Sequence, residues 1–233
     1  MGPTQPKIEY IGAERAPLVT IDGYADDPAG LVDFAAAHCA FHPVAGNLYP
    51  GIRAPAPEDY VRDLVLRLEG LVREVFQMGD LQVRDCTCNF SLVTTTPDRL
   101  QLRQIVPHYD TVDVHQLAVL HYLCPAEHGG TSFYRHRATG YEVITADRCD
   151  RYVASLAAGL SSHGLPPRAY IDGDTTLFER IAKVDAAFNR LVIYRSANLH
   201  SGNIGRNFKF EQDVHNGRLT LNTFLQFGPH APA

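Results

Sequence analysis

The 233-residue chain has no apolar run of the length that a membrane span needs, so no membrane partner is expected. Its first residues, 1–6, lack the basic and apolar regions of a signal peptide, which predicts a cytoplasmic location. A long basic run is also missing, and the net charge is −5. A large phosphate-binding surface would need clustered positive charge, and so no nucleic-acid partner is expected.

The cysteines lack the spacing of a disulfide framework. Cys86 and Cys88 would share one face of a strand, but no second cysteine pair completes a zinc site with them. Structural roles are therefore favoured over metal or redox roles, as expected of reduced intracellular thiols. The five cysteines are Cys39, Cys86, Cys88, Cys124 and Cys149.

Internal repeats and low-complexity segments are also absent. With 45% hydrophobic and 20% charged residues, the composition is that of a globular protein with a sizeable core. Helical periodicity prevails in residues 1–80 and strand patterns prevail in residues 81–227. This order predicts one α+β domain over residues 1–233, mainly β, in which N-terminal helices support a β-sandwich.

Periodicity and turn residues give the expected elements. A loop is predicted over 47–55, with a tight turn at Pro50-Gly51. This loop is either an ordinary surface loop or a substrate-facing loop that presents Tyr49 and Arg53. A helical insertion over about 141–185 is expected to cover one end of the core. Predicted strands lie within 7–21 and over 82–95, 100–105, 112–123, 191–194 and 217–225, with another after Gly130, and predicted helices lie over 28–39, 57–78, 147–160 and 175–184.

His108 and Asp110 have the spacing of two residues on one face of a β-strand. An imidazole and a carboxylate placed side by side need a third ligand from elsewhere, and His200 follows a later strand. Two histidines and one carboxylate leave open positions on an octahedral metal, an arrangement associated with non-haem Fe(II) and oxygen chemistry. By itself a His-x-Asp pattern recurs by chance, so its weight comes from the surrounding motifs.

Four motifs in this order resemble those of the Fe(II)- and 2-oxoglutarate-dependent oxygenases, in particular the prolyl-hydroxylase-like branch. The resemblance covers residues 85–227, roughly the C-terminal two thirds. One departure is that Tyr134 stands where the family has proline. The motifs are His108-Tyr109-Asp110, then Tyr122-Leu123 followed by Gly129-Gly130-Thr131-Ser132-Phe133, then His200, and finally Arg218-Leu219-Thr220.

The resemblance implies a double-stranded β-helix, or jelly roll, that binds Fe(II) through His108, Asp110 and His200. It also implies 2-oxoglutarate as co-substrate, held by Arg218 and Thr220. Tyr122 is either a further contact to 2-oxoglutarate or a core aromatic. An arginine suits the far carboxylate because its planar fork can bind it through two hydrogen bonds.

The spacing of the anchor departs from the family pattern. Arg218 lies eighteen residues after His200, farther than is usual in the family, and this is interpreted as an enlarged loop over 207–216. Arg206 and Lys209 therefore remain alternative anchors. Structural or solvated roles are expected for the other histidines considered, which are His115 and His121 on a strand and His128, His136 and His215 in turns or loops.

The implied activity is a hydroxylase that couples decarboxylation of 2-oxoglutarate to oxidation of a C–H bond by molecular oxygen. Asp110 favours hydroxylation, because halogenation would need that ligand position vacant. A peptidyl or amino-acid-derived substrate is preferred. The alternatives are a cupin-like iron dioxygenase that does not use 2-oxoglutarate, and a non-catalytic jelly-roll protein that binds a metal or ligand.

Overall fold

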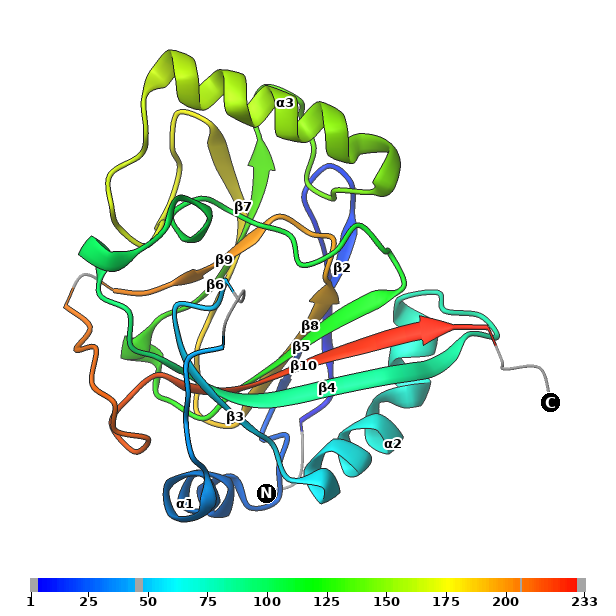
Figure 1. Ribbon diagram of the computed structural model, residues 1–233. Coiled ribbons are helices and arrows are strands. Elements are labelled where there is room, and N and C mark those ends of the chain that lie inside the picture. Colours follow the sequence, from blue (N-terminus) through cyan, green and yellow to red (C-terminus); the bar gives the residue numbers. More distant parts are fainter. Residues whose placement is uncertain (1–3, 45–47, 206, 230–233) are drawn as a thin grey trace.

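Two antiparallel sheets form most of the protein (Figure 1), of which a computed structural model describes residues 4–44, 48–205 and 207–229. The helices are α1 (Pro28–His38), α2 (Glu58–Val75) and α3 (Ala146–His163), with short 3-10 turns η1 (Pro97–Arg99), η2 (Leu102–Gln104) and η3 (Ala126–His128). The strands are β1 (Lys7–Ile11), β2 (Ala16–Asp22), β3 (Gly51–Pro55), β4 (Gln82–Val93), β5 (Gln116–Tyr122), β6 (Gly130–His136), β7 (Phe178–Asp185), β8 (Arg190–Arg195), β9 (His200–Asn203) and β10 (Leu219–Gly228).

The larger sheet has seven strands in the order β1-β2-β8-β5-β10-β4-β3, and the smaller has three in the order β7-β6-β9. An isolated bridge between His108 and His200 adds the segment before β5 to the β9 edge of the smaller sheet. The described pairings are antiparallel. The predicted class, a mainly β protein with helices, is therefore confirmed.

Alternation along β5 separates the two faces of the larger sheet. Leu117 and Val119 pack outward into the core that contains α2, whereas Leu120 and Tyr122 pack inward against residues of the smaller sheet such as Phe133. This is the two-residue period of a strand that is buried on both faces. The space between the sheets is thus lined by every second residue of the central strands.

Helix α2 covers the outer face of the larger sheet. Its buried residues Leu64, Leu68, Val72 and Val75 recur every three or four positions and join the outer core, as an amphipathic helix requires. Helix α1 begins after Asp27, whose carboxylate accepts a hydrogen bond from Gly30 N, and it packs over Phe90 and Leu92 with Val32 and Ala35. Figure 1 shows both helices along the larger sheet and α3 at the far end. The supporting helices are as predicted.

The predicted helix over 175–184 is wrong. Most of this segment is β7, which pairs with β6 from Asp185 opposite Gly130 to Phe178 opposite His136. Its charged residues resemble an exposed helix face, but β6 needs a second partner strand, and such tertiary pairing overrides local preference. The insertion over 141–185 therefore contributes one helix, α3, and then a strand.

The predicted strand over 100–105 is also wrong. The segment forms η2, in which the Gln104 side chain accepts a hydrogen bond from Gln101 N at 2.7 Å. The strand predicted over 112–123 begins later, at Gln116. The predicted loop over 47–55 becomes a strand from Gly51 onward, β3, at the edge of the larger sheet, while Asn47 lies outside the described residues.

None of the helices in the described ranges has both the length and the apolar character needed to cross a membrane.

Candidate metal centre and its cavity

The backbone holds His108 and His200 opposite each other. His108 N donates to His200 O at 2.9 Å, and His200 N donates to His108 O at 2.8 Å. Two residues on, Asp110 N donates to Ser196 O at 2.8 Å. Three backbone hydrogen bonds therefore fix the backbone positions of the two histidines and the aspartate.

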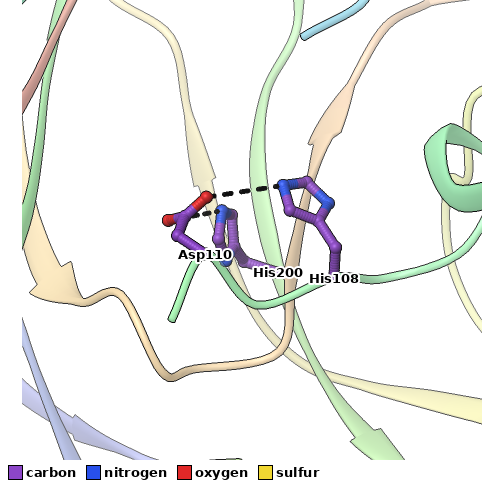
Figure 2. Close-up of side chains that lie close together, drawn as sticks. All are labelled: His108, Asp110 and His200. Atoms are coloured by element: carbon purple, nitrogen blue, oxygen red, sulfur yellow. Dashed lines mark ion pairs between the residues drawn. The ribbon is translucent and has the colours of Figure 1, made fainter. Parts of the chain in front are cut away.

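These three side chains point toward one another (Figure 2). His200 Nε2 lies 3.7 Å from Asp110 Oδ2, and His108 Nε2 lies 4.0 Å from Asp110 Oδ1. One ligand atom from each residue lies within 4.8 Å of the other two, a spacing at which all three could hold one metal ion. Within the described parts of the chain, no other group of histidine, cysteine or acidic residues meets this condition. The structure thus brings together the three residues that the motifs selected.

The protonation of the two histidines leaves ring nitrogens available to bind a cation. His200 Nδ1 lies 2.9 Å from Asn198 O, so this nitrogen carries the proton and donates it, leaving the Nε2 lone pair free. Burial lowers the pKa of His108 well below its usual value, which keeps that imidazole neutral. Burial also raises the pKa of Asp110, while the charges of His200 and Arg53 act in the opposite direction.

The donor set therefore fits a divalent metal. Two imidazoles and one carboxylate provide two nitrogen ligands and one oxygen ligand. A bound cation would also offset the desolvation that the carboxylate suffers without it.

The triad lines a cavity of about 640 Å³, which lies within the usual range for small-molecule sites. Strands β3, β5, β8, β9 and β10 contribute to its wall, together with the segment that carries η2. Beyond the triad, its lining includes Tyr49, Arg53, Arg103, Gln104, Leu120, Thr131, Tyr170, Tyr194, Arg218, Asn222 and Phe224.

Arg218 is buried in the wall of this cavity, with 4% of its surface exposed. One guanidinium nitrogen donates to Gly130 O at 3.0 Å, and the guanidinium carbon lies 5.4 Å from the Tyr122 ring centroid. Its Nε is buried and has no hydrogen-bond partner among the described residues. A buried guanidinium with a donor to spare is suited to an anion that enters the cavity.

Tyr122 and Thr220 lie beside Arg218 on the inner face but do not line the cavity. The Tyr122 hydroxyl is 2.7 Å from Thr131 Oγ1, and the Thr220 hydroxyl donates to Asn222 Oδ1 at 2.7 Å. Both side chains are fully buried. Their predicted contacts to 2-oxoglutarate stay predictions.

The alternative anchors are placed differently. Lys209 is exposed and is not part of the cavity wall, whereas Arg206 lies outside the described residues.

Several residues of the wall were missed by the motifs. The ring of Tyr194 on β8 lies 4.9 Å from that of His200, and its inward direction follows from strand alternation. Arg103 and Tyr170 belong to irregular segments with no periodic pattern. Of the two interpretations of the Pro50-Gly51 turn, the structure favours the loop that faces the site, because Tyr49 and Arg53 line the cavity.

The remaining histidines take no part in the metal group. His121 points away from the cavity, as alternation predicts, and lies 3.0 Å from both the Tyr60 hydroxyl and Asn189 Oδ1. His136 was expected in a turn but is the last residue of β6, where its Nδ1 is 2.9 Å from Thr139 Oγ1.

Comparison with protein families places the chain over residues 3–225 in a family of unknown function, DUF6445, to which it therefore belongs. Among curated proteins no match is found.

Solved structures with a similar fold include HygX from Streptomyces hygroscopicus with nickel, 2-oxoglutarate and hygromycin B bound; identity is 12%, coverage is 90% of this chain and 82% of that chain, and the TM-score is 0.49. They also include the non-haem α-ketoglutarate-dependent epimerase SnoN from nogalamycin biosynthesis. Its identity is 15%, the match covers 91% of this chain and 78% of that chain, and the TM-score is 0.49. For AviO1 from Streptomyces viridochromogenes Tue57 the identity is 17%, the match covers 92% of this chain and 91% of that chain, and the TM-score is 0.45.

Proposed function

We propose that this protein is an Fe(II)- and 2-oxoglutarate-dependent oxygenase that hydroxylates a C–H bond. One observation carries the proposal: a His108, Asp110 and His200 group shares a cavity with the buried guanidinium of Arg218. A metal-binding face and a separate cation in one enclosed space match a co-substrate that chelates at one end and carries a carboxylate at the other.

The path of the chain supports a double-stranded β-helix as the fold. From β4 onward the chain passes to the His108 bridge, to β5, to β6 and β7, to β8, to β9 and to β10. It thus alternates between the larger and the smaller sheet, except that β6 and β7 both belong to the smaller sheet. Residues 81–227 would form this core, supported by residues 1–80 within a single domain.

Each part of the site has a separate task. His108, Asp110 and His200 would hold the iron at the wall of the cavity, where 2-oxoglutarate and oxygen could reach it. When bound, iron would activate molecular oxygen, of which one atom would go to succinate as 2-oxoglutarate loses carbon dioxide and the other would go to the substrate C–H bond to give an alcohol. Arg218 would bind the far carboxylate of 2-oxoglutarate and so set its orientation. Leu120 and Tyr194 would limit the entry of water.

The proposed substrate is peptidyl or amino-acid-derived. The cavity is large enough for 2-oxoglutarate and a side-chain-sized group together. Its wall combines aromatic rings from Tyr49 and Tyr170 with hydrogen-bonding groups such as Gln104. These supply both the apolar contact and the polar contacts that such a substrate needs.

The test is succinate formation by the protein loaded anaerobically with Fe(II) and 2-oxoglutarate and then exposed to oxygen. The unaltered protein is expected to form succinate, because these enzymes turn over 2-oxoglutarate slowly even without the substrate. Asp110→Ala is expected to lose the activity and more than about 100-fold in metal affinity, since even residues that only support a ligand change metal affinity by factors of 10–100. Asp150→Ala, on the exposed side of α3, is the matched control.

Full succinate production by Asp110→Ala would show that the triad is assigned wrongly. Metal binding without any succinate from the unaltered protein would favour a non-catalytic binding protein. Oxygen consumption that does not depend on 2-oxoglutarate would favour the cupin-like dioxygenase.

A further inference from the structure

A second arginine lines the cavity, apart from the one proposed to bind 2-oxoglutarate. Arg53 is the middle residue of β3, where it pairs with Ser91 of β4, and Ser91 pairs with Thr220 of β10. Directly paired residues of neighbouring strands point to the same face of a sheet. Arg53 therefore faces the inside of the larger sheet. Its strand, β3, is separated by β4 from β10, the strand that begins directly after Arg218.

The distance between the two arginines follows from the sheet. Neighbouring strands lie about 4.8 Å apart, so the backbones at Arg53 and Thr220 are separated by roughly 10 Å. Arg53 and Arg218 thus enter the same cavity from backbone positions that are separated in the sheet. Arg53 lies on the side of the metal group, where its charge and that of Asp110 influence each other.

The guanidinium of Arg53 has no acidic partner within the described ranges. Its Nε is buried without a hydrogen-bond partner, and its guanidinium carbon lies 4.6 Å from the Tyr49 ring centroid. Two other partly buried arginines pair with acidic residues, Arg190 with Asp22 at 2.6 Å and Arg135 with Glu142 at 2.5 Å. Burial lowers the pKa of Arg53. Leaving a buried donor unsatisfied is costly, and an anionic ligand would remove that cost.

Counting the anions of the proposed reaction leaves Arg53 free for the substrate. The co-substrate has two carboxylates, one that chelates the metal and one that Arg218 would bind. Arg103 is a further cation in the wall, and it lies near enough to His108 for its charge to act on that imidazole. The metal side of the cavity therefore carries more positive charge than the co-substrate uses.

We propose that Arg53 is a specificity-determining residue that binds an anionic group, a carboxylate or a phosphate, of the oxidised substrate. This inference rests on the proposed function. Tyr49 contacts the guanidinium through its ring, a contact that does not occupy the N–H donors as an acceptor oxygen would. An anion held at Arg53 would bring a neighbouring C–H bond into the cavity that the His108, Asp110 and His200 group lines.

The test uses protein loaded with Ni(II) and 2-oxoglutarate, because nickel fills the metal site without turnover. Calorimetry compares three probes of similar length: hexanoate, pentyl phosphate and hexanamide. At least one anion is expected to bind about tenfold or more tightly than the neutral amide. The loss of a buried charged hydrogen bond weakens binding by more than the free energy that corresponds to a tenfold change in Kd. The carboxylate and the phosphate distinguish the two sources of negative charge.

Arg53→Gln is expected to remove this preference for the anion, and Arg53→Lys is expected to retain part of it. Arg62→Gln on the exposed face of α2 is the matched control. The affinity for 2-oxoglutarate, measured separately by calorimetry, is expected to stay within about threefold in all three variants, well below the tenfold step of a lost charged pair.

Equal binding of all three probes to the unaltered protein, or binding of none, would overturn the proposal. So would an anion preference that survives in Arg53→Gln. If Arg53→Gln loses 2-oxoglutarate itself while the unaltered protein binds it, Arg53 serves the co-substrate, and the proposed function stands without this inference. If the unaltered protein fails to bind 2-oxoglutarate, both fail.

Discussion

Glu142 and Arg218 are both buried charged residues, but among the residues that the structure describes only Glu142 meets an opposite charge. Glu142 pairs with Arg135 and accepts hydrogen bonds from the backbone N–H groups of Ala13 and Glu14, both at 2.9 Å. It thereby ties the β1-β2 turn to β6. A buried charge that is fully paired serves the fold, whereas one that faces a cavity is available for a ligand.

Glu142→Gln is expected to lower the free energy of unfolding by roughly 1–3 kcal/mol, because it replaces the buried carboxylate that accepts hydrogen bonds from Arg135 and from two backbone N–H groups. Glu179→Gln is the matched control, since Glu179 binds the same Arg135 from a position that is 40% exposed. Its loss is expected to cost about 0–1 kcal/mol. Urea denaturation measures both. Equal losses would mean that Glu142 contributes no more than a surface ion pair.

Arg218→Gln is expected to weaken 2-oxoglutarate binding by roughly two orders of magnitude, as the loss of a buried charge pair implies. Metal affinity should change little, because Arg218 lies outside the triad. Calorimetry on the nickel-loaded protein measures both affinities, with Lys209→Gln as an exposed control on the loop before β10. Should Lys209→Gln or Arg206→Gln show the loss instead, the anchor would lie in that loop.

At the scale of elements, a hydrogen-bonded network joins α2 to the larger sheet. His121 of β5 accepts from the Tyr60 hydroxyl at Nδ1 and donates to Asn189 Oδ1 from Nε2. Asn189 also accepts from Ala25 N at 2.8 Å and has a positive φ of 65°, a conformation that asparagine tolerates better than most residues. The edge of Tyr24 packs against the same imidazole. One neutral histidine thus links a helix, a strand and a turn.

This network predicts a stability that depends on pH. Burial lowers the pKa of His121 from 6.5 to about 4, opposed by the hydrogen bond to Asn189. Because the unfolded chain binds the proton more readily, this stabilising contribution is complete above pH 6.5 and is lost as the pH falls toward 4. The difference between the two pKa values corresponds to roughly 3 kcal/mol at full effect.

Urea midpoints between pH 7 and pH 4 measure this dependence, and His121→Gln is expected to reduce its slope. His115→Gln is the control, since His115 is half exposed just before the same strand. A slope that persists unchanged in His121→Gln would place the titrating group elsewhere.

Elements with strong periodicity were predictable, and those defined by their neighbours were not. Helix α2 repeats buried residues every three or four positions, so it could be placed from the sequence. Strand β7 could not, because only its pairing with β6 decides against a helix. The same holds for η2, where a reciprocal hydrogen bond between Gln101 and Gln104 replaces the expected strand.

For the whole molecule, the three residues of the candidate metal group could be identified from the order of the motifs, which selected His108, Asp110 and His200, although His108 forms an isolated bridge and is not part of a strand. The role now proposed for Arg53 depends on the register of β3 against β4 and of β4 against β10. That register brings together residues about 170 positions apart, which no local pattern encodes. The sequence suggested that the turn before Arg53 could face a substrate. It did not indicate that Arg53 would line the same cavity as the metal group.

Metal and co-substrate together are expected to stabilise the whole fold, since the triad joins two segments that are far apart in the chain. At about a hundredfold excess over Kd a ligand adds about 2.7 kcal/mol. For a chain of this size, that corresponds to a rise in Tm of roughly 5–10 °C. Differential scanning fluorimetry with Ni(II) and 2-oxoglutarate measures the rise, which Asp110→Ala should abolish. An equal rise in Asp110→Ala would indicate that the metal binds elsewhere.

The reciprocal hydrogen bonds between the backbones of His108 and His200 also bear on how the site can evolve. The spacing of two of the three ligands is set by main-chain atoms, which side-chain replacements in the cavity wall leave in place. Mutations at Tyr49, Arg103 or Tyr170 can therefore alter which molecule is accepted without dismantling the reactive centre. A family built on such a scaffold can diversify its substrates while keeping one reaction.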